Sequence, residues 1–180
     1  MKLAAISYQA GEGGAIDAIL REVAADLRQQ GFKIAGAVQW NEPAKEAGSG
    51  DTRCDMVLED LATGQRFDVS AGQSPDPHAC RLNSHALEHV AGLVASSIGP
   101  GIDLVILNRF GKQEAARAGF RAIIEAAVAN DLPVLTGLNR AHSALWKDFT
   151  GDAAADITPS AEAIRAWWSG VRAEKRGSPA

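Results

Sequence analysis

The sequence predicts a single α/β domain in which helices cover both faces of a mainly parallel sheet. Nearly continuous apolar runs at 2–7, 102–107 and 133–138 are typical of strands that are buried on both faces. Amphipathic helical patterns alternate with these runs, as they do in parallel sheets. The chain has 180 residues, 46% of them hydrophobic, which suits one domain with a sizeable core. We expect the domain to occupy residues 1–175, followed by a disordered tail at 176–180.

The first half of the chain begins with a predicted strand and a helix that ends at Gly31, because a glycine there can close a helix in the left-handed conformation. Turn residues at 62–64 separate two short strand-like runs, which predicts a β-hairpin that leaves the main sheet as an excursion. The elements expected in this half are a strand at 2–7, a helix at 15–30, a strand at 33–40 and hairpin strands at 54–59 and 65–70.

The second half repeats the alternation of helix and strand. Asn83 or Ser84 is expected to cap the first helix of this half, and Ser160 the last one. The expected elements are a helix at 84–97, a strand at 102–107, a loop at 109–114, a helix at 115–129, a strand at 133–138, a short helix at 142–149, a short strand ending at Ile157 and a helix at 160–174.

Composition and charge narrow the class of protein. A net charge of −4 argues against a nucleic-acid partner. The sequence contains no apolar run of membrane-spanning length, so we expect no membrane segment. It also shows no secretory signal pattern, and two cysteines fit a reduced compartment. Together these features predict a cytoplasmic protein.

The turn after the first strand is rich in glycine. A strand, a glycine-rich turn and a helix form the layout of a phosphate-binding loop. Gly11, Gly13 and Gly14 would let backbone amides approach an anion, although Glu12 adds an adverse charge. The alternative is a tight turn that needs glycine only for its geometry.

The same loop lacks the side chains of nucleotide hydrolysis. If Gly13 is the second glycine of the pattern G-x-x-x-x-G-K-[ST], the lysine position holds Gly14 and the hydroxyl position holds Ala15. The lysine would bind the terminal phosphates and the hydroxyl would hold Mg²⁺. We therefore expect no catalytic residues of this kind, no cofactor and no metal, while the question of an enzymatic activity stays open.

The order of elements resembles the small P-loop nucleoside-triphosphatases first described from thermophiles. In that family the second motif follows a buried strand and reads D-E-I-G-K-M-E. The corresponding residues here are Asn108-Arg109-Phe110-Gly111-Lys112-Gln113-Glu114. The segment Asp156-Ile157-Thr158-Pro159, before the last helix, is also similar to that family. The resemblance implies a P-loop-like fold, but Asn108 and Arg109 replace its acidic pair, so the motifs are degenerate.

A closer resemblance, over nearly the whole length, is to an uncharacterised bacterial family often encoded beside molybdate-uptake genes. It implies a role near molybdenum or another oxyanion. It rests on Cys54-Asp55-Met56, on Cys80-Arg81-Leu82-Asn83-Ser84-His85-Ala86-Leu87-Glu88 and on Leu107-Asn108-Arg109-Phe110-Gly111-Lys112-Gln113-Glu114.

Cationic side chains follow the second buried strand, at the edge of the sheet where ligands bind in such folds. Arginine suits a tetrahedral oxyanion because its planar fork donates aligned hydrogen bonds. The alternative is that these residues are solvated loop charges that pair with Glu12, Asp17 or Glu114. The predicted ligand-binding set is Gly11, Gly13, Gly14, Arg81, Asn108, Arg109 and Lys112.

Two smaller groups of residues have alternative interpretations. Cys80, His85 and His89 are an alternative metal site, although their spacing matches no standard zinc module. Trp167 and Trp168 are adjacent and point about 100° apart on a helix, so one of them is expected to face a partner subunit in a homodimer.

The principal functional hypothesis is a non-hydrolytic binding protein for a small oxyanion, with molybdate as the leading candidate. The first alternative is a nucleotide-binding protein or weak nucleoside-triphosphatase. The second is a protein-interaction module on a degenerate triphosphatase scaffold.

Overall fold

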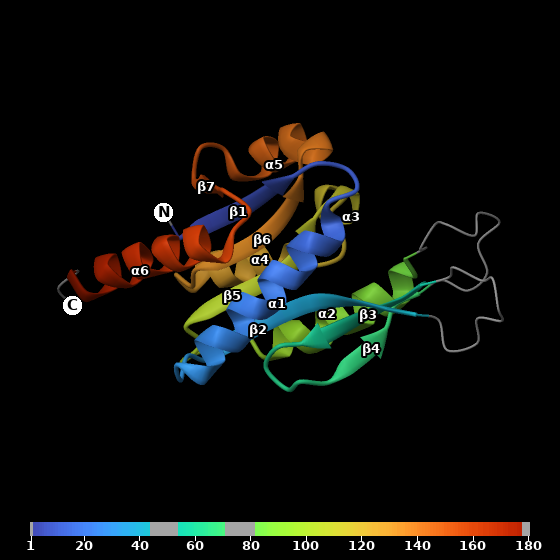
Figure 1. Ribbon diagram of the computed structural model, residues 1–180, viewed down its shortest axis with the longest axis horizontal. Coiled ribbons are helices and arrows are strands. Elements are labelled where there is room, and N and C mark those ends of the chain that lie inside the picture. Colours follow the sequence, from blue (N-terminus) through green and yellow to red (C-terminus); the bar gives the residue numbers. More distant parts are fainter. Residues whose placement is uncertain (1, 44–53, 71–81, 178–180) are drawn as a thin grey trace.

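The computed structural model describes residues 2–43, 54–70 and 82–177 and has three layers, with helices on both faces of one sheet (Figure 1). The sheet has seven strands in the order β4-β3-β2-β5-β6-β1-β7. This arrangement confirms the predicted α/β class with a mostly parallel sheet. The strands are β1 (Leu3–Tyr8), β2 (Ile34–Pro43), β3 (Cys54–Asp60), β4 (Arg66–Asp68), β5 (Leu104–Phe110), β6 (Val134–Asn139) and β7 (Ala154–Ile157).

The predicted hairpin forms, but it extends the sheet instead of leaving it. Strand β3 pairs antiparallel with β2, from Ala37 opposite Asp60 to Pro43 opposite Cys54. On its other side β2 pairs in parallel with β5 only as far as Ala37. The hairpin therefore pairs the edge of β2 that faces away from β5, which would otherwise leave backbone hydrogen bonds unmade.

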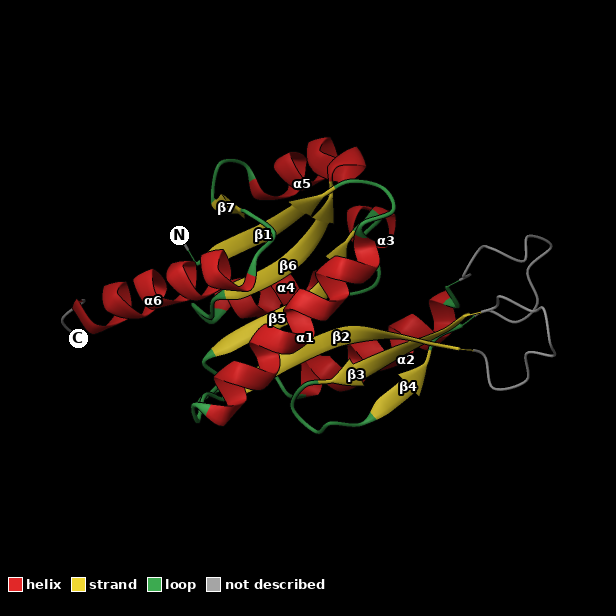
Figure 2. Cartoon of the chain, viewed as in Figure 1, coloured by secondary structure: helices red, strands yellow, loops and turns green. Residues whose placement is uncertain are grey.

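Each face of the sheet has its own hydrophobic core, under the helices that Figure 2 shows on both faces. Helices α1 and α6 pack on one face, where Leu20 and Ile164 are fully buried. Helices α2, α4 and α5 pack on the other face, where Val94 and Ile124 are buried. The helices are α1 (Gly13–Gln29), α2 (Ser84–Ser96), α3 (Lys112–Ala115), α4 (Arg121–Ala129), α5 (Ser143–Thr150) and α6 (Ala161–Gly177), with a 3-10 turn at Arg140–His142.

Two expected boundaries around the second motif are wrong. Strand β5 continues to Phe110, so Arg109 lies in a strand and not in a loop. The helix expected at 115–129 is divided into α3 and α4. Arg117 and Gly119 between them have φ angles of 66° and 59°, which an α-helix cannot accommodate.

Several local predictions are confirmed. Gly31 closes α1 with a φ of 87°. The side chain of Asn83 caps α2 by accepting from the amides of His85 and Ala86, so it is Asn83 and not Ser84 that acts as the cap. Ser160 Oγ accepts from the amide of Ala163 at 3.1 Å at the start of α6.

The tryptophans of α6 pack on the core shared with α1. Trp168 is 5% exposed and makes an edge-to-face contact with Phe32. Trp167 is partly buried against the same core. The homodimer remains a prediction.

None of the helices in the described ranges is long and apolar enough to span a membrane.

Candidate anion-binding site

In the loop between β1 and α1, the acidic residue Glu12 forms hydrogen bonds with the backbone of Gln9 in the same loop. The carboxylate of Glu12 accepts from the amide of Gln9 at 2.7 Å, and the amide of Glu12 donates to the carbonyl of Gln9 at 3.1 Å. Gly11 has a φ of 91°, a conformation that favours glycine. Helix α1 starts at Gly13, and the first amides of a helix have no partner within it. The positive end of α1 therefore lies at this loop.

Arg109 reaches the same loop from β5. Its Nη2 donates to both carboxylate oxygens of Asp17 on α1, at 2.9 and 2.7 Å. Asp17 is fully buried, at 0% exposure, whereas the side chain of Arg109 is 35% exposed. The buried carboxylate of Asp17 thus holds the guanidinium in place. An ion pair of Arg109 with Asp17 was one of the pairings in the alternative interpretation of the sequence.

The guanidinium lies directly against the first residue of α1. A Cβ atom added at Gly13 would be 3.0 Å from Nη2 and 3.4 Å from Nη1 of Arg109. The Nε of Arg109 is buried and has no hydrogen-bond partner among the described residues. The structure therefore brings together two members of the predicted set, Gly13 and Arg109.

A methyl group at Gly13 is expected to displace Arg109. Because the added Cβ meets the guanidinium at 3.0 Å and Asp17 holds that guanidinium in place, Gly13→Ala should be less stable than Gly14→Ala by about 1 kcal/mol, as expected for overpacking. Gly14→Ala is the matched control, since a Cβ there meets nothing within 4 Å. Urea unfolding of both variants measures the difference, and equal stabilities would contradict the contact between Gly13 and Arg109.

Asn108 has a structural partner. It is 3% exposed, and its Oδ1 accepts from the amide of Gln39 at 3.1 Å while its Nδ2 donates to Gln39 Oε1 at 2.9 Å. This double contact joins β5 to β2 just beyond Ala37 and Leu107, where the backbone pairing of the two strands stops. The side-chain amide of Asn108 is thereby occupied within the protein, so its predicted role as a ligand has no support in this arrangement.

Lys112 lies beside a cavity of about 290 Å³ near the carboxyl end of β5. Arg109 also lines this cavity, so it borders both the loop and the cavity. The other residues of the described lining are Gln39, Met56, Leu58, Val69, Leu82, Leu87, Asn108, Gly111, Gln113, Glu114, Phe120 and His142.

Glu114 organises the segment after β5, a role that our interpretation of the sequence missed. It is 5% exposed, and its carboxylate accepts from the amides of Gly111 at 2.9 Å and Phe120 at 3.2 Å. Burial raises the pKa of Glu114 above its ordinary value, although these hydrogen bonds oppose the shift, and the nearby charge of Glu88 adds to it. The signal in the sequence is the spacing of Gly111 and Glu114, which allows a side chain to reach back three residues.

Glu114→Gln is expected to flatten part of the pH dependence of stability. A carboxyl group whose pKa is raised on folding holds its proton more tightly in the folded state, so its contribution to the free energy of unfolding falls as pH rises. The fall begins near the ordinary value of 4.5 and is complete above the raised pKa. Urea unfolding from acid to neutral pH should show the variant gaining on the natural protein as pH rises. A constant difference would contradict the shift.

Two predicted residues cannot be placed, and the two histidines of the alternative metal site lie on α2. Arg81 and Cys80 lie outside the described residues. His85 and His89 are exposed on α2. Within the described ranges, no group of three or more histidine, cysteine, aspartate or glutamate side chains is placed to hold a metal ion.

Comparisons with known proteins agree with this architecture. The fold is similar to that of THEP1 from the hyperthermophile Aquifex aeolicus, with a TM-score of 0.56 over 95% of this chain and 96% of that one. At 14% identity this likeness shows the fold alone, the P-loop-like fold that the resemblance implied.

A curated relative is the "Molybdenum import ATP-binding protein ModC 2" of Bradyrhizobium diazoefficiens, 34% identical over 167 residues. The match covers 93% of this chain but spans only 18% of the relative's length. A family described as "Protein of unknown function (DUF2478)" matches residues 3–167. These findings confirm the resemblance to an uncharacterised family near molybdate uptake, and the chain belongs to the family of proteins of unknown function DUF2478.

Proposed function

We propose that this protein binds a small oxyanion without hydrolysing nucleotides, at the loop between β1 and α1. The observation that carries the proposal is the position of the Arg109 guanidinium, against Gly13 at the start of α1. A P-loop triphosphatase places a lysine at its loop, and here a guanidinium from β5, which is separated from β1 by β6, supplies the positive group.

The charges around Arg109 define which contacts an anion would make. Both oxygens of Asp17 accept from Nη2, so the pair is electrically balanced and one edge of the guanidinium is occupied. Nη1 lies 3.4 Å from the position of a Cβ atom at Gly13, slightly farther than Nη2 at 3.0 Å. A tetrahedral oxyanion would accept from Nη1 and from the first amides of α1, which combine a charge-assisted hydrogen bond with the helix dipole.

The surroundings of the loop argue against hydrolysis. The positions for the lysine and the Mg²⁺ hydroxyl hold Gly14 and Ala15, and Asn108 is engaged by Gln39. The loop therefore lacks the groups that bind Mg²⁺ and a terminal phosphate. Molybdate is the first oxyanion to test because the relative in Bradyrhizobium is named for molybdenum import.

Nucleotide binding is the second candidate. It is favoured by the fold shared with THEP1 and by the name of the relative, an ATP-binding protein. The two candidates differ in their need for Mg²⁺, since a triphosphate is normally bound together with the metal.

A thermal-shift screen tests the proposal with molybdate, tungstate, sulfate, phosphate, ATP and GTP, each with and without Mg²⁺. An oxyanion present at 100 times its Kd should stabilise the protein by about 2.7 kcal/mol, independently of Mg²⁺. Stabilisation by ATP or GTP that requires Mg²⁺, with no response to any oxyanion, would replace the proposal by the second candidate.

Purified protein is expected to hydrolyse ATP and GTP no faster than a blank. The physical reason is the absence of a lysine and a hydroxyl at Gly14 and Ala15. Phosphate release measured with Mg²⁺ gives the result. Turnover that persists through purification and is lost in Gly13→Val would contradict a non-hydrolytic role.

A further inference from the structure

One side of the hairpin's part of the sheet is open. Leu58 of β3 is buried in the core shared with α2, so its neighbours Val57 and Glu59 point to the opposite side. Figure 1 shows α2 behind β3 and β4, while beyond α1 the other side of these strands carries no helix from the described ranges. Trp40 of β2 pairs with Val57 across this open side.

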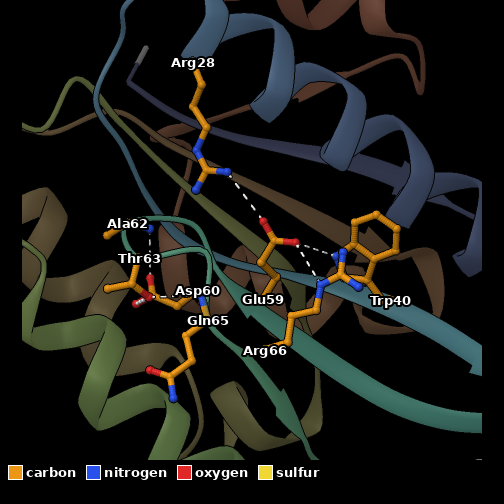
Figure 3. A network of polar contacts seen from close by, with 8 residues as sticks. All are labelled: Arg28, Trp40, Glu59, Asp60, Ala62, Thr63, Gln65 and Arg66. Carbon is orange, nitrogen blue, oxygen red and sulfur yellow. Dashed lines mark hydrogen bonds and ion pairs between the residues drawn. The ribbon is translucent and has the colours of Figure 1, made fainter.

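Trp40 is held there by charged side chains. The guanidinium carbons of Arg21 and Arg66 lie 4.4 and 4.0 Å from the centroid of its ring. Its indole N–H donates to Glu59 at 2.9 Å (Figure 3). The ring is therefore fixed, because both its π-surface and its polar edge are engaged.

Three arginines surround this ring and the carboxylate that its indole N–H contacts. Glu59 is 3.5 Å from Arg28 and 3.4 Å from Arg66, so its one carboxylate faces more than one guanidinium (Figure 3). Glu22, another acid at the same place, is engaged by Arg165 at 2.9 Å. At the ring itself, Arg21, Arg28 and Arg66 thus face one carboxylate, that of Glu59, whereas the whole chain has a net charge of −4.

A groove of about 400 Å³ between α1 and the hairpin is lined by Arg21, Glu22, Arg28, Trp40 and Glu59. Its floor includes the apolar side chains of Val38 and Leu61. We call it the Trp40 groove and define it by the side chains of Arg21, Glu22, Arg28, Trp40 and Glu59, with Arg66 beside it against Trp40.

We propose that the Trp40 groove docks an acidic segment of a polypeptide partner. Tryptophan and arginine are the side chains most enriched where protein interfaces concentrate their binding energy. Guanidinium groups bind carboxylates in pairs of aligned hydrogen bonds. The segment of the Bradyrhizobium relative that matches this chain is 18% of a longer polypeptide, so a domain of this kind works beside further protein.

The geometry favours a protein over a nucleic acid. Single-stranded nucleic acids are bound largely by stacking of bases on aromatic rings. With two guanidinium groups within 4.4 Å of the ring centroid, little of the Trp40 ring is open to a base.

The test uses the full chain and an octaglutamate peptide as the probe. The indole N–H signal of Trp40, assigned with Trp40→Phe, should shift saturably in NMR spectra at low salt. Arg21→Glu should weaken the affinity for the peptide by about tenfold or more, because charge reversal at an interface repels the partner. Arg66→Gln, on a side chain that is 44% exposed, should weaken it as well, because it removes one guanidinium group beside the groove.

Arg172→Glu is the matched control. Arg172 stacks on Phe32 at 4.4 Å, the same arrangement at a distance from the groove, and its reversal should leave the affinity within about twofold. Tighter binding of an oligothymidylate than of octaglutamate at the Trp40 signal would overturn the proposal in favour of a nucleic-acid site. No shift with either probe would show that the cluster only stabilises the hairpin.

Discussion

Arg109→Ala is expected to destabilise the domain by roughly 3 kcal/mol, the lower end of the range for a broken buried ion pair. The variant leaves the carboxylate of Asp17 without its guanidinium partner, and that carboxylate is fully buried. The lower end of the range applies because the Arg109 side chain is 35% exposed. Urea unfolding at neutral pH measures the loss.

A matched control separates this effect from the loss of a surface charge. Lys112→Ala removes an exposed cation close to Arg109 in sequence and should change stability by no more than about 0.5 kcal/mol. The double variant Asp17→Asn with Arg109→Met should recover part of the stability, since it leaves no unpaired buried charge. Equal losses in Arg109→Ala and Lys112→Ala would contradict a structural ion pair.

The same substitution addresses the proposed function. If Nη1 of Arg109 binds the oxyanion, Arg109→Ala should weaken binding by about 10- to 150-fold, as expected for a lost charge-assisted hydrogen bond of 1.5–3 kcal/mol. Arg109→Lys keeps the positive charge but loses the planar guanidinium group. We therefore expect this variant to retain more of the protein's stability than of its affinity for the oxyanion, which separates the structural role of Arg109 from its role in binding. Calorimetry with molybdate measures both variants. An affinity that changes by threefold or less in the alanine variant would place the anion elsewhere.

Gly36→Val is expected to prevent the domain from folding. Gly36 has a φ of 116°, and a Cβ there would lie 1.9 Å from the carbonyl oxygen of Ile106 on the paired strand β5. That neighbour is backbone in the middle of the sheet and cannot rotate away. The cost should exceed about 4 kcal/mol, which is a large fraction of the stability of a typical domain.

The control for Gly36 is another glycine with no such constraint. Gly92 lies within α2, and a Cβ there meets nothing within 4 Å. Gly92→Ala should therefore stabilise the fold by up to about 1 kcal/mol. Circular dichroism melting of both variants gives the comparison. A Gly36→Val protein that unfolds cooperatively near the melting temperature of the natural protein would contradict the close contact between Gly36 and the backbone of β5.

The elements themselves could be predicted because their signals are local. Apolar runs and helical periodicity identified the strands and most helices, and glycine at position 31 identified the end of α1. The division of α3 from α4 was missed because it depends on Glu114, whose carboxylate bonds to the amides of Gly111 and Phe120. A periodic pattern does not show where a buried side chain will find its partners.

The sequence by itself determined the class of the fold, the glycine-rich loop and the absence of the nucleotide-binding lysine, since these depend on residue type and short spacing. Only the tertiary structure decided the partner of Arg109. Asp17 lies 92 residues away, and the two meet because α1 packs across the sheet beside β5. It also decided that the hairpin extends the sheet beside β2. Both outcomes depend on which elements lie side by side, and local patterns do not carry that information.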